Sequence, residues 1–164
     1  MTSEQKAWVF MAASQAYSAG HVYPRMAAVE AALESAYGTS QLARLGNNLF
    51  GMKQHVHPVC GTLSLPTKEY LDNQWVTVSA EWVEYPSFLA CYQDRMATLM
   101  RLRTAYTHYN NALMADTPED YVKEVSQTWS TDPARAGNCI AIFHEVFPPL
   151  ATNDEVQAAA AGEK

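Results

Sequence analysis

The sequence predicts an α+β fold in which a mainly helical body carries a small β-hairpin lobe. Apolar residues recur at helical spacing before residue 46 and again after residue 87, whereas residues 62–82 alternate in the manner of strands. Hydrophobic residues make up 48% of the 164 residues and charged residues 17%, which is typical of a globular chain that buries a core. We therefore expect one domain over residues 1–150, followed by a flexible tail over residues 151–164.

Three helices are predicted in the first part of the chain. The opening stretch is typical of an amphipathic helix and not of a secretion signal, because its short apolar patch is broken by Ser14 and Gln15. Pro24 suits the first position of a second helix, and Gly38 suits a left-handed cap at its end. A short third helix is expected over residues 41–45. The residues expected to face the core are Trp8, Met11 and Ala12 in the first helix and Met26, Val29 and Leu33 in the second.

The middle of the chain predicts a hairpin and then further helices. Residues 62–65 and 75–82 alternate and are rich in Val, Thr and Trp, and residues 71–74 are the expected turn between them. Helical spacing returns over residues 87–103, where Met100 is among the side chains expected to face the core. The two later helix starts that proline marks are Thr117–Pro118 and Asp132–Pro133.

The acidic balance of the chain argues against binding to nucleic acid. The formal net charge is −6 and the pI about 5.3, and no apolar run is long enough to span a membrane. The three cysteines form no CxxC pair, so we expect buried free thiols and not a disulfide framework. His55, His57 and Cys60 lie close in sequence, but no fourth ligand lies near them, so we expect no metal and no cofactor.

Glu34 is the residue best placed to carry chemistry. On a helical wheel it lies about 100° from Leu33 and so borders the apolar stripe of its helix. A carboxyl group at such a border is partly desolvated, which raises its pKa and favours the protonated form that a general acid needs. Periodicity alone favours a simpler alternative, a solvated glutamate like Glu30 one turn earlier.

Four ordered motifs connect the chain with a known family. Residues 34–53, ESAYGTSQLARLGNNLFGMK, contain Glu-Ser, Gly-x-Ser and Asn-Asn-Leu-Phe-Gly-x-Lys. The later motifs are TKEY at residues 67–70, Tyr85-Pro86-Ser87 followed by Asp94, and WSTDP at residues 129–133. Together they resemble the signature of the glucosaminidase family of peptidoglycan hydrolases, glycoside hydrolase family 73, from Ala7 to Phe147.

The resemblance implies a lysozyme-like fold with a substrate groove between the helical body and the β-lobe. It implies an endo-β-N-acetylglucosaminidase that hydrolyses the β-1,4 bond after N-acetylglucosamine in peptidoglycan, with Glu34 as the general acid. Glu69 matches the β-lobe glutamate that activates water, since hydrolysis of a sugar acetal generally needs two carboxyl roles. The acetamido group of the substrate could replace this second carboxylate, and an inverting or a retaining course stays open. Weaker candidates for the second role are Asp72, Glu81 and Glu84.

Six residues are expected to bind the substrate. Asn48 and Phe50 are expected to face the groove, whereas Asn47 and Leu49 buttress the turn that Gly51 permits. The full set of expected substrate-binding residues is Asn48, Phe50, Tyr85, Tyr106, Trp129 and Asp132.

The chain departs from the family pattern at two places. Trp129 stands where the family usually has Tyr, and an indole can stack on a sugar but lacks an acidic hydroxyl. Either this position serves packing, or Tyr106 or Tyr109 replaces the phenol, or activity is reduced. Trp82-Val83 replaces the common Phe-Arg, which removes one charge partner.

Two alternatives to this hydrolase remain open: a lytic transglycosylase or muramidase on the same fold, and a non-catalytic glycan-binding module. The expected partner in every case is the glycan strand of bacterial cell-wall peptidoglycan, and the expected state is a monomer. Action on the wall is periplasmic or extracellular. Because no signal peptide is recognisable, we expect delivery of the phage or effector type, as for an endolysin.

Overall fold

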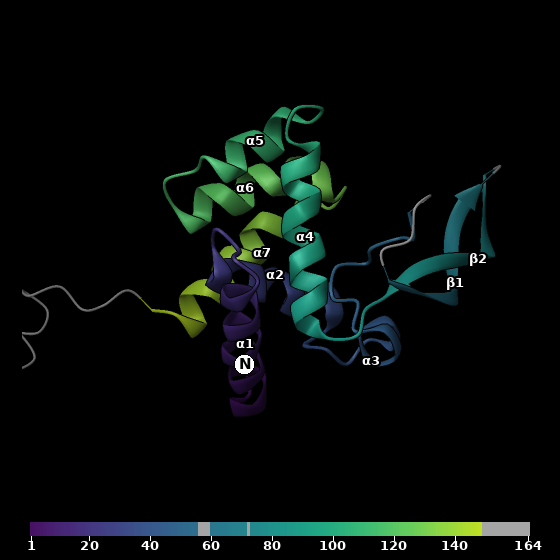
Figure 1. The fold of residues 1–164 in the computed structure, drawn as a ribbon, viewed down its shortest axis with the longest axis horizontal. Coiled ribbons are helices and arrows are strands. Elements are labelled where there is room, and N and C mark those ends of the chain that lie inside the picture. Colours follow the sequence, from purple (N-terminus) through teal and green to yellow (C-terminus); the bar gives the residue numbers. More distant parts are fainter. Residues whose placement is uncertain (56–59, 72, 149–164) are drawn as a thin grey trace, which may run out of the picture.

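A computed structural model describes residues 1–55, 60–71 and 73–148, without the side chains of residues 68–71 and 75. The fold is a helical body with one antiparallel hairpin projecting from its side, as predicted (Figure 1). The helices are α1 (Ser3–Ser18), α2 (Pro24–Ser35), α3 (Gln41–Gly46), α4 (Phe88–Leu102), α5 (Thr107–Leu113), α6 (Pro118–Trp129) and α7 (Arg135–Val146). The strands are β1 (Gly61–Leu71) and β2 (Gln74–Glu84).

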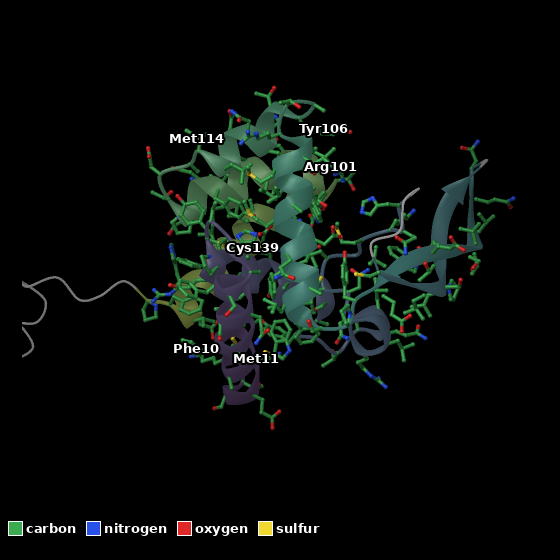
Figure 2. The ribbon with its side chains drawn as sticks, viewed as in Figure 1. Phe10, Met11, Arg101, Tyr106, Met114 and Cys139 are labelled. Atoms are coloured by element: carbon green, nitrogen blue, oxygen red, sulfur yellow. The ribbon has the colours of Figure 1, made fainter. Side chains whose placement is uncertain are left out.

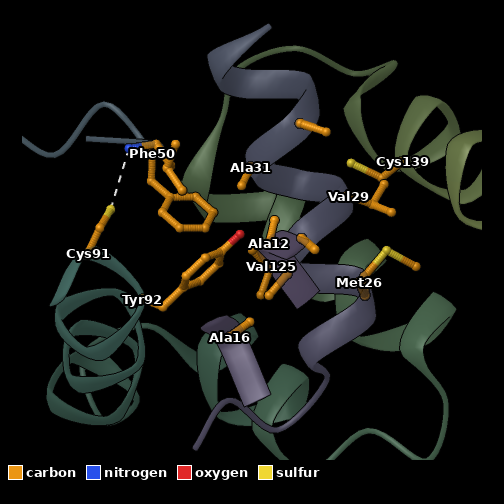
Figure 3. Close-up of a cluster of buried hydrophobic side chains, with 14 of the residues drawn as sticks. Ala12, Ala16, Met26, Val29, Ala31, Phe50, Cys91, Tyr92, Val125 and Cys139 are labelled. Carbon is orange, nitrogen blue, oxygen red and sulfur yellow. Dashed lines mark hydrogen bonds between the residues drawn. The ribbon is translucent and has the colours of Figure 1, made fainter. Parts of the chain in front are cut away.

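Helix α2 is the central element of the helical body. Seven consecutive residues, 26–32, are fully buried, so this helix has no solvent face over that span. Four of them are the alanines Ala27, Ala28, Ala31 and Ala32, whose small side chains let the neighbouring helices approach closely. Figure 3 shows α2 among side chains contributed by α1, α4, α6 and α7. A helix enclosed in this way buries more than the single stripe that its periodicity predicts.

The hairpin is joined to the body through α3 and the loop that follows it. Strand β1 pairs with β2 from Gly61 opposite Glu84 to Leu71 opposite Gln74, so both strands are longer than predicted. The N–H of Tyr85 donates to the carbonyl of Gly46 at 2.8 Å, and the N–H of Val83 donates to that of Met52 at 3.0 Å. Two ends of the loop are therefore bonded to the hairpin.

Helix α2 ends differently from the prediction. It stops at Ser35, because Ala36 and Tyr37 already adopt left-handed backbone with φ of 50° and 55°. Gly38 also has positive φ, 75°, but its second role is close packing: a Cβ there would lie 2.6 Å from Nε1 of Trp8. The chain thus leaves the helix two residues earlier than the glycine suggests.

Some predicted core faces are rotated, and one helix was not predicted. In α1, Val9, Ala12 and Ala16 are buried, whereas Met11 is 40% exposed. Met100 of α4 is likewise 43% exposed. Helix α5 has no proline or strong periodicity to mark it in the sequence. The error in α1 and α4 is a rotation of roughly one residue about each helix.

Cys91 and Cys139 are buried free thiols, as expected, whereas the free Cys60 is only half-buried. Cys91 accepts a hydrogen bond from the N–H of Leu49 at 3.4 Å, which ties the loop after α3 to α4 (Figure 3). Among the described residues, no helix combines the length and apolar character needed to cross a bilayer.

Candidate active site

Glu34 lies in the last turn of α2, and its side chain is 19% exposed. Its Oε1 accepts hydrogen bonds from Nε of Arg135 at 3.1 Å and from Nη2 of the same guanidinium. Its Oε2 accepts one longer bond, 3.3 Å, from the indole Nε1 of Trp129. The carboxyl group is therefore held by α7 on one oxygen and by the end of α6 on the other.

The prediction that Glu30 is solvated is wrong. Glu30 is fully buried, and its Oε1 accepts bonds from Arg95 at 2.8 Å and from Arg135 at 2.7 Å. The hydroxyl of Tyr121 donates to its Oε2 at 3.2 Å. Burial of a carboxylate is tolerated here because two guanidinium groups and a phenol surround it.

The two glutamates differ in their affinity for a proton. Burial raises the pKa of Glu34 above its usual value, and the charges of Arg135 and Arg95 oppose this without cancelling it. For Glu30, burial acts in the same direction, but Arg95 and Arg135 outweigh it and lower its pKa. Glu34 also stands at the negative end of the α2 dipole, which disfavours its ionised form. Of the two, Glu34 is the carboxyl group suited to carry a proton.

Aromatic faces enclose Arg95 between the buried charges and the surface. The guanidinium carbon of Arg95 lies 3.4 Å from the ring centre of Trp129 and 4.8 Å from that of Phe50. The Phe50 ring also meets Tyr92 edge to face, at 5.4 Å between centres (Figure 3). Trp129 thus packs against Arg95 through its ring and donates a hydrogen bond to Glu34 through its indole N–H.

Two adjoining hollows run past Glu34. The first has a volume of about 480 Å³ and the second about 470 Å³, and they share Phe50, Gly51 and Trp129. The described residues that line the first are Leu33, Glu34, Phe50, Gly51, Trp129, Ser130, Asp132 and Arg135. Those that line the second are Phe50, Gly51, Met52, Lys53, His55, Thr98, Arg101, Leu102, Tyr109 and Trp129. The pair forms one trough, which we call the groove.

Asn48 does not face the groove, contrary to the prediction. It is 1% exposed, and its amide nitrogen donates to the carbonyls of Met52 and Val83, both at 2.9 Å. Its amide oxygen accepts from the N–H of Met52 at 2.9 Å. Asn48 therefore closes the turn that carries Phe50 and fastens it to β2. Its neighbour Asn47 takes a left-handed conformation and donates to the carbonyl of Tyr85 at 2.9 Å, which is the buttress expected of it.

The tyrosines expected to bind substrate lie away from Glu34. Tyr85 is 2% exposed, and its hydroxyl donates to Asp94. Tyr106 is exposed, packs against Tyr109, and lies near the start of α5, far from the hairpin (Figure 2). Tyr109 lines the second hollow beside Trp129. Of the two phenols considered as substitutes, only Tyr109 reaches the groove.

Of the remaining expected residues, only Asp132 has a described side chain. Asp132 lines the first hollow, and its Oδ1 accepts from the N–H of Ala134 at 2.9 Å, which shapes the turn before α7. Glu69 lies in β1 opposite Val76, and its side chain lies outside the described residues. The side chains of Asp72 and His57 lie outside the described part as well.

Sequence reasoning missed Arg135 and Arg95, yet two signals point to them. Glu30 and Glu34 stand four residues apart on one helix face, where like charges repel unless cations lie between them. Arg135 begins a helix, a position where the dipole disfavours a cation and which therefore indicates a specific anionic partner.

The sequence of the chain matches a family model over residues 11–146, described as glucosaminidase, mannosyl-glycoprotein endo-beta-N-acetylglucosaminidase. A probable N-acetylmuramidase of Lactococcus lactis subsp. cremoris (strain MG1363) is 32% identical over 120 residues, covering 71% of this chain and 27% of the relative. The exo-glucosaminidase LytG of Bacillus subtilis (strain 168) is 28% identical over 151 residues, covering 84% of this chain and 52% of the relative. The chain thus spans about a quarter and about half of these two relatives.

Solved structures share the fold. The catalytic domain of the autolysin Auto from Listeria monocytogenes superposes with a TM-score of 0.77 at 24% identity, covering 89% of this chain and 86% of that one. A glycoside hydrolase domain of FlgJ from Salmonella typhimurium gives a TM-score of 0.69 at 24% identity, covering 87% and 97%. The predicted architecture of a helical body with a hairpin lobe is therefore confirmed as the fold of these hydrolase domains.

Proposed function

The chain belongs to the glucosaminidase family of peptidoglycan hydrolases, and on this premise we propose that it hydrolyses the β-1,4 bond after N-acetylglucosamine, within glycan strands. Glu34 is the general acid of this proposal. The observation that carries it is the position of the Glu34 carboxyl, which is mostly buried, has a raised pKa and borders the groove. A carboxyl group with these properties keeps a proton for a leaving oxygen.

Proton transfer starts from Oε2 of Glu34. Oε1 is occupied by two donors of Arg135, whereas among the described residues Oε2 accepts only the longer bond from Trp129. The proton on Oε2 passes to the glycosidic oxygen as the bond between that oxygen and the anomeric carbon breaks. Water then adds to the anomeric carbon and loses its proton, which restores the acid after turnover.

The second role falls to a group that activates this water or stabilises the sugar cation. We propose Glu69, which β1 carries on the lobe. Participation of the substrate acetamido group is the alternative, and it needs no second carboxylate on the protein. The product anomer, observed by NMR immediately after cleavage, distinguishes an inverted from a retained configuration. Glu69→Gln then tests the residue: a lasting loss of rate supports Glu69, and wild-type rate excludes it.

The groove accommodates an extended glycan. Phe50 and Trp129 line both hollows, and aromatic side chains can stack on sugar rings. The second hollow is lined by Lys53, His55 and Arg101, whose side chains can donate hydrogen bonds to hydroxyl and carboxylate groups of the substrate. A strand that crosses both hollows passes Glu34 with sugar on either side, as an endo-acting enzyme requires.

Glu34→Gln is the direct test. The amide keeps the shape of the carboxyl group but cannot give up a proton, so we expect lysis of purified peptidoglycan to fall by about 10²–10⁴-fold. Glu145→Gln is the control, because Glu145 is an exposed helical glutamate that pairs with the N-terminus at 3.0 Å. Circular dichroism and glycan pull-down check that the fold and binding persist. A wild-type rate in Glu34→Gln would remove this residue from the mechanism.

Analysis of the digestion products decides between this activity and the second candidate. The Lactococcus relative bears the name probable N-acetylmuramidase, which favours a muramidase as that candidate. After borohydride reduction, mass spectrometry detects reduced N-acetylglucosamine ends for the proposed activity and reduced muramic ends for a muramidase. An absence of products would favour a glycan-binding module. Action on the wall, outside the cytoplasmic membrane, is part of the proposal, and a phage or effector type of delivery stays a prediction.

A further inference from the structure

Arg135, the first residue of α7, joins the two carboxylates of α2. Its guanidinium donates from Nη2 to Glu30 at 2.7 Å and from Nε to Glu34 at 3.1 Å. Nη1 donates to the hydroxyl of Ser126 on α6 at 2.8 Å. Every nitrogen of this side chain has a partner, and the residue is 2% exposed. Such a guanidinium has one geometry available to it.

The buried carboxylate of Glu30 fixes the position of Arg135. Because Glu30 also binds Arg95 at 2.8 Å and its pKa is lowered by both cations, it stays ionised. Two carboxylates and two guanidiniums then cancel when Glu34 is ionised, and one positive charge remains when Glu34 is protonated. The protonation of Glu34 therefore changes the net charge of this buried cluster, and Arg135 is the cation that contacts both carboxyl groups.

We propose that Arg135 is a positioning residue, which turns Oε2 of Glu34 toward the groove and limits how readily Glu34 takes up a proton. This inference rests on the proposed role of Glu34 as the general acid. The Arg135 bonds occupy Oε1 and leave the proton to Oε2, which lies 3.3 Å from Nε1 of Trp129, a residue that lines the groove. Without Arg135 the carboxyl would be free to rotate, and its proton would be bound more tightly.

Other groups near Glu34 do not replace this effect. Tyr109, Tyr121 and Cys139 are neutral, since burial raises the pKa of each. Asp132 is exposed to solvent on the first hollow, where water screens its charge. The charged and titratable described residues around Glu34 are Glu30 from α2, Arg95 from α4, Tyr109 from α5, Tyr121 from α6, Asp132 from the turn before α7, and Arg135 and Cys139 from α7.

The expected signature is a shift in pH dependence. Activity needs protonated Glu34, so the rate falls on the alkaline side as this proton is lost. Arg135 opposes the effect of burial on the pKa of Glu34. Removing the guanidinium charge raises that pKa further, and the alkaline limb of the kcat/KM profile moves to higher pH. A role for Arg135 in packing alone would lower activity at every pH and leave the limb in place.

The experiment compares Arg135→Gln with Arg135→Lys in the full chain. For Arg135→Gln we expect the alkaline limb to move up by about one pH unit or more, with a lower rate at the optimum. Arg135→Lys keeps the charge but not the fork, so its limb should move far less while its rate still falls. Arg25→Gln is the control, because Arg25 stacks on Phe147 away from the groove. An unchanged or lowered limb in Arg135→Gln would overturn the inference.

A second measurement keeps the inference testable without catalysis. Carbon-13 NMR follows the titration of the Glu34 carboxyl directly, with Glu34→Gln identifying its signal. Ser126→Ala removes only the Nη1 partner of Arg135, so it serves if Arg135→Gln fails to fold, and it should raise the Glu34 midpoint by a smaller amount. A midpoint unmoved in every folded variant would refute the role of Arg135. A raised midpoint in a protein without lytic activity would support that role and refute the proposed function.

Discussion

The two turns of α2 that carry Glu30 and Glu34 place the same side chain in opposite circumstances. Glu30 is fully buried and bonded to Arg95, Arg135 and Tyr121. Glu34, one turn later, shares Arg135 as a hydrogen-bond donor with Glu30, and its side chain lines the groove. Depth and the number of cations therefore decide whether a helical glutamate serves structure or chemistry, because residue type and helix face are the same for both.

The comparison also explains why a hydrolase keeps a buried carboxylate that touches no substrate. Glu30 balances the charge of Arg95 and Arg135, which would otherwise be two buried cations. With Glu30 ionised, both guanidiniums stay in place and Glu34 can change its protonation without disturbing them. We call the turn that carries Glu30 the inner turn and the turn that carries Glu34 the outer turn. We expect the inner turn to govern stability and the outer turn to govern activity.

The largest effect on stability should come from Glu30→Gln. Loss of this carboxylate removes the ionised partner that Arg95 and Arg135 both contact, so we expect the free energy of unfolding to fall by about 3–5 kcal/mol. Urea unfolding followed by circular dichroism measures it. Glu119→Gln, which removes a surface pair with His144, is the matched control and should cost less than about 1 kcal/mol. Equal decreases in the free energy of unfolding of the two variants would contradict the special role of Glu30 in stability.

The pH dependence of stability should reveal the inner region next. His21 packs edge to face on Tyr121, and burial lowers its pKa to about 4. As the pH is lowered from 6.5 to about 4, the unfolded chain binds a proton at His21 that the folded chain does not. The free energy of unfolding therefore decreases over this range. The slope from this group approaches about 1.4 kcal/mol per pH unit. His21→Gln should flatten the profile by that amount, and profiles that run parallel would contradict the prediction.

Trp129→Phe is the smallest change and tests the outer turn. The ring over Arg95 is kept, but the N–H that donates to Oε2 of Glu34 is lost, a bond of about 1 kcal/mol. We expect kcat/KM to fall about threefold to tenfold, with little change in stability. Tyr109→Phe is the companion variant and should stay within about twofold of the wild type. A greater loss in Tyr109→Phe would mean that this phenol, and not the indole, assists Glu34.

Local patterns predicted every helix and strand except α5, whereas tertiary packing determined which faces are buried. Pro24, Ser87 and Thr117 begin or cap helices where the sequence indicates, because these signals act within one turn. Met11 and Met100 were misplaced because the face that a helix buries depends on its neighbours, which periodicity resolves only to about one residue. Glu30 follows the same rule: its pattern in the sequence indicates a solvated residue, and its burial results from partners that α4, α6 and α7 supply.

The candidate site was predictable as far as its motifs extend. Glu34, Phe50, Trp129 and Asp132 meet at one hollow, and each belongs to a motif of the resemblance. Asn48 belongs to a motif as well, but a motif records that a residue is needed and not which way its side chain points. Arg135 supplies the main charge beside Glu34 from 101 positions away, a separation that no local pattern spans.

The alanines of α2 have a consequence for anyone redesigning this protein. Ala31 and Ala32 precede Glu34 in α2 and are fully buried, so the position of the carboxyl group depends on close packing around small side chains. At Ala31, one added methyl group would force neighbouring side chains or α2 itself to shift, a change of about 1–3 kcal/mol that would also move the acid relative to its guanidinium. Variants with higher activity should therefore be sought among the residues that line the groove, because larger side chains at the buried positions of α2 would disturb the packing that positions Glu34.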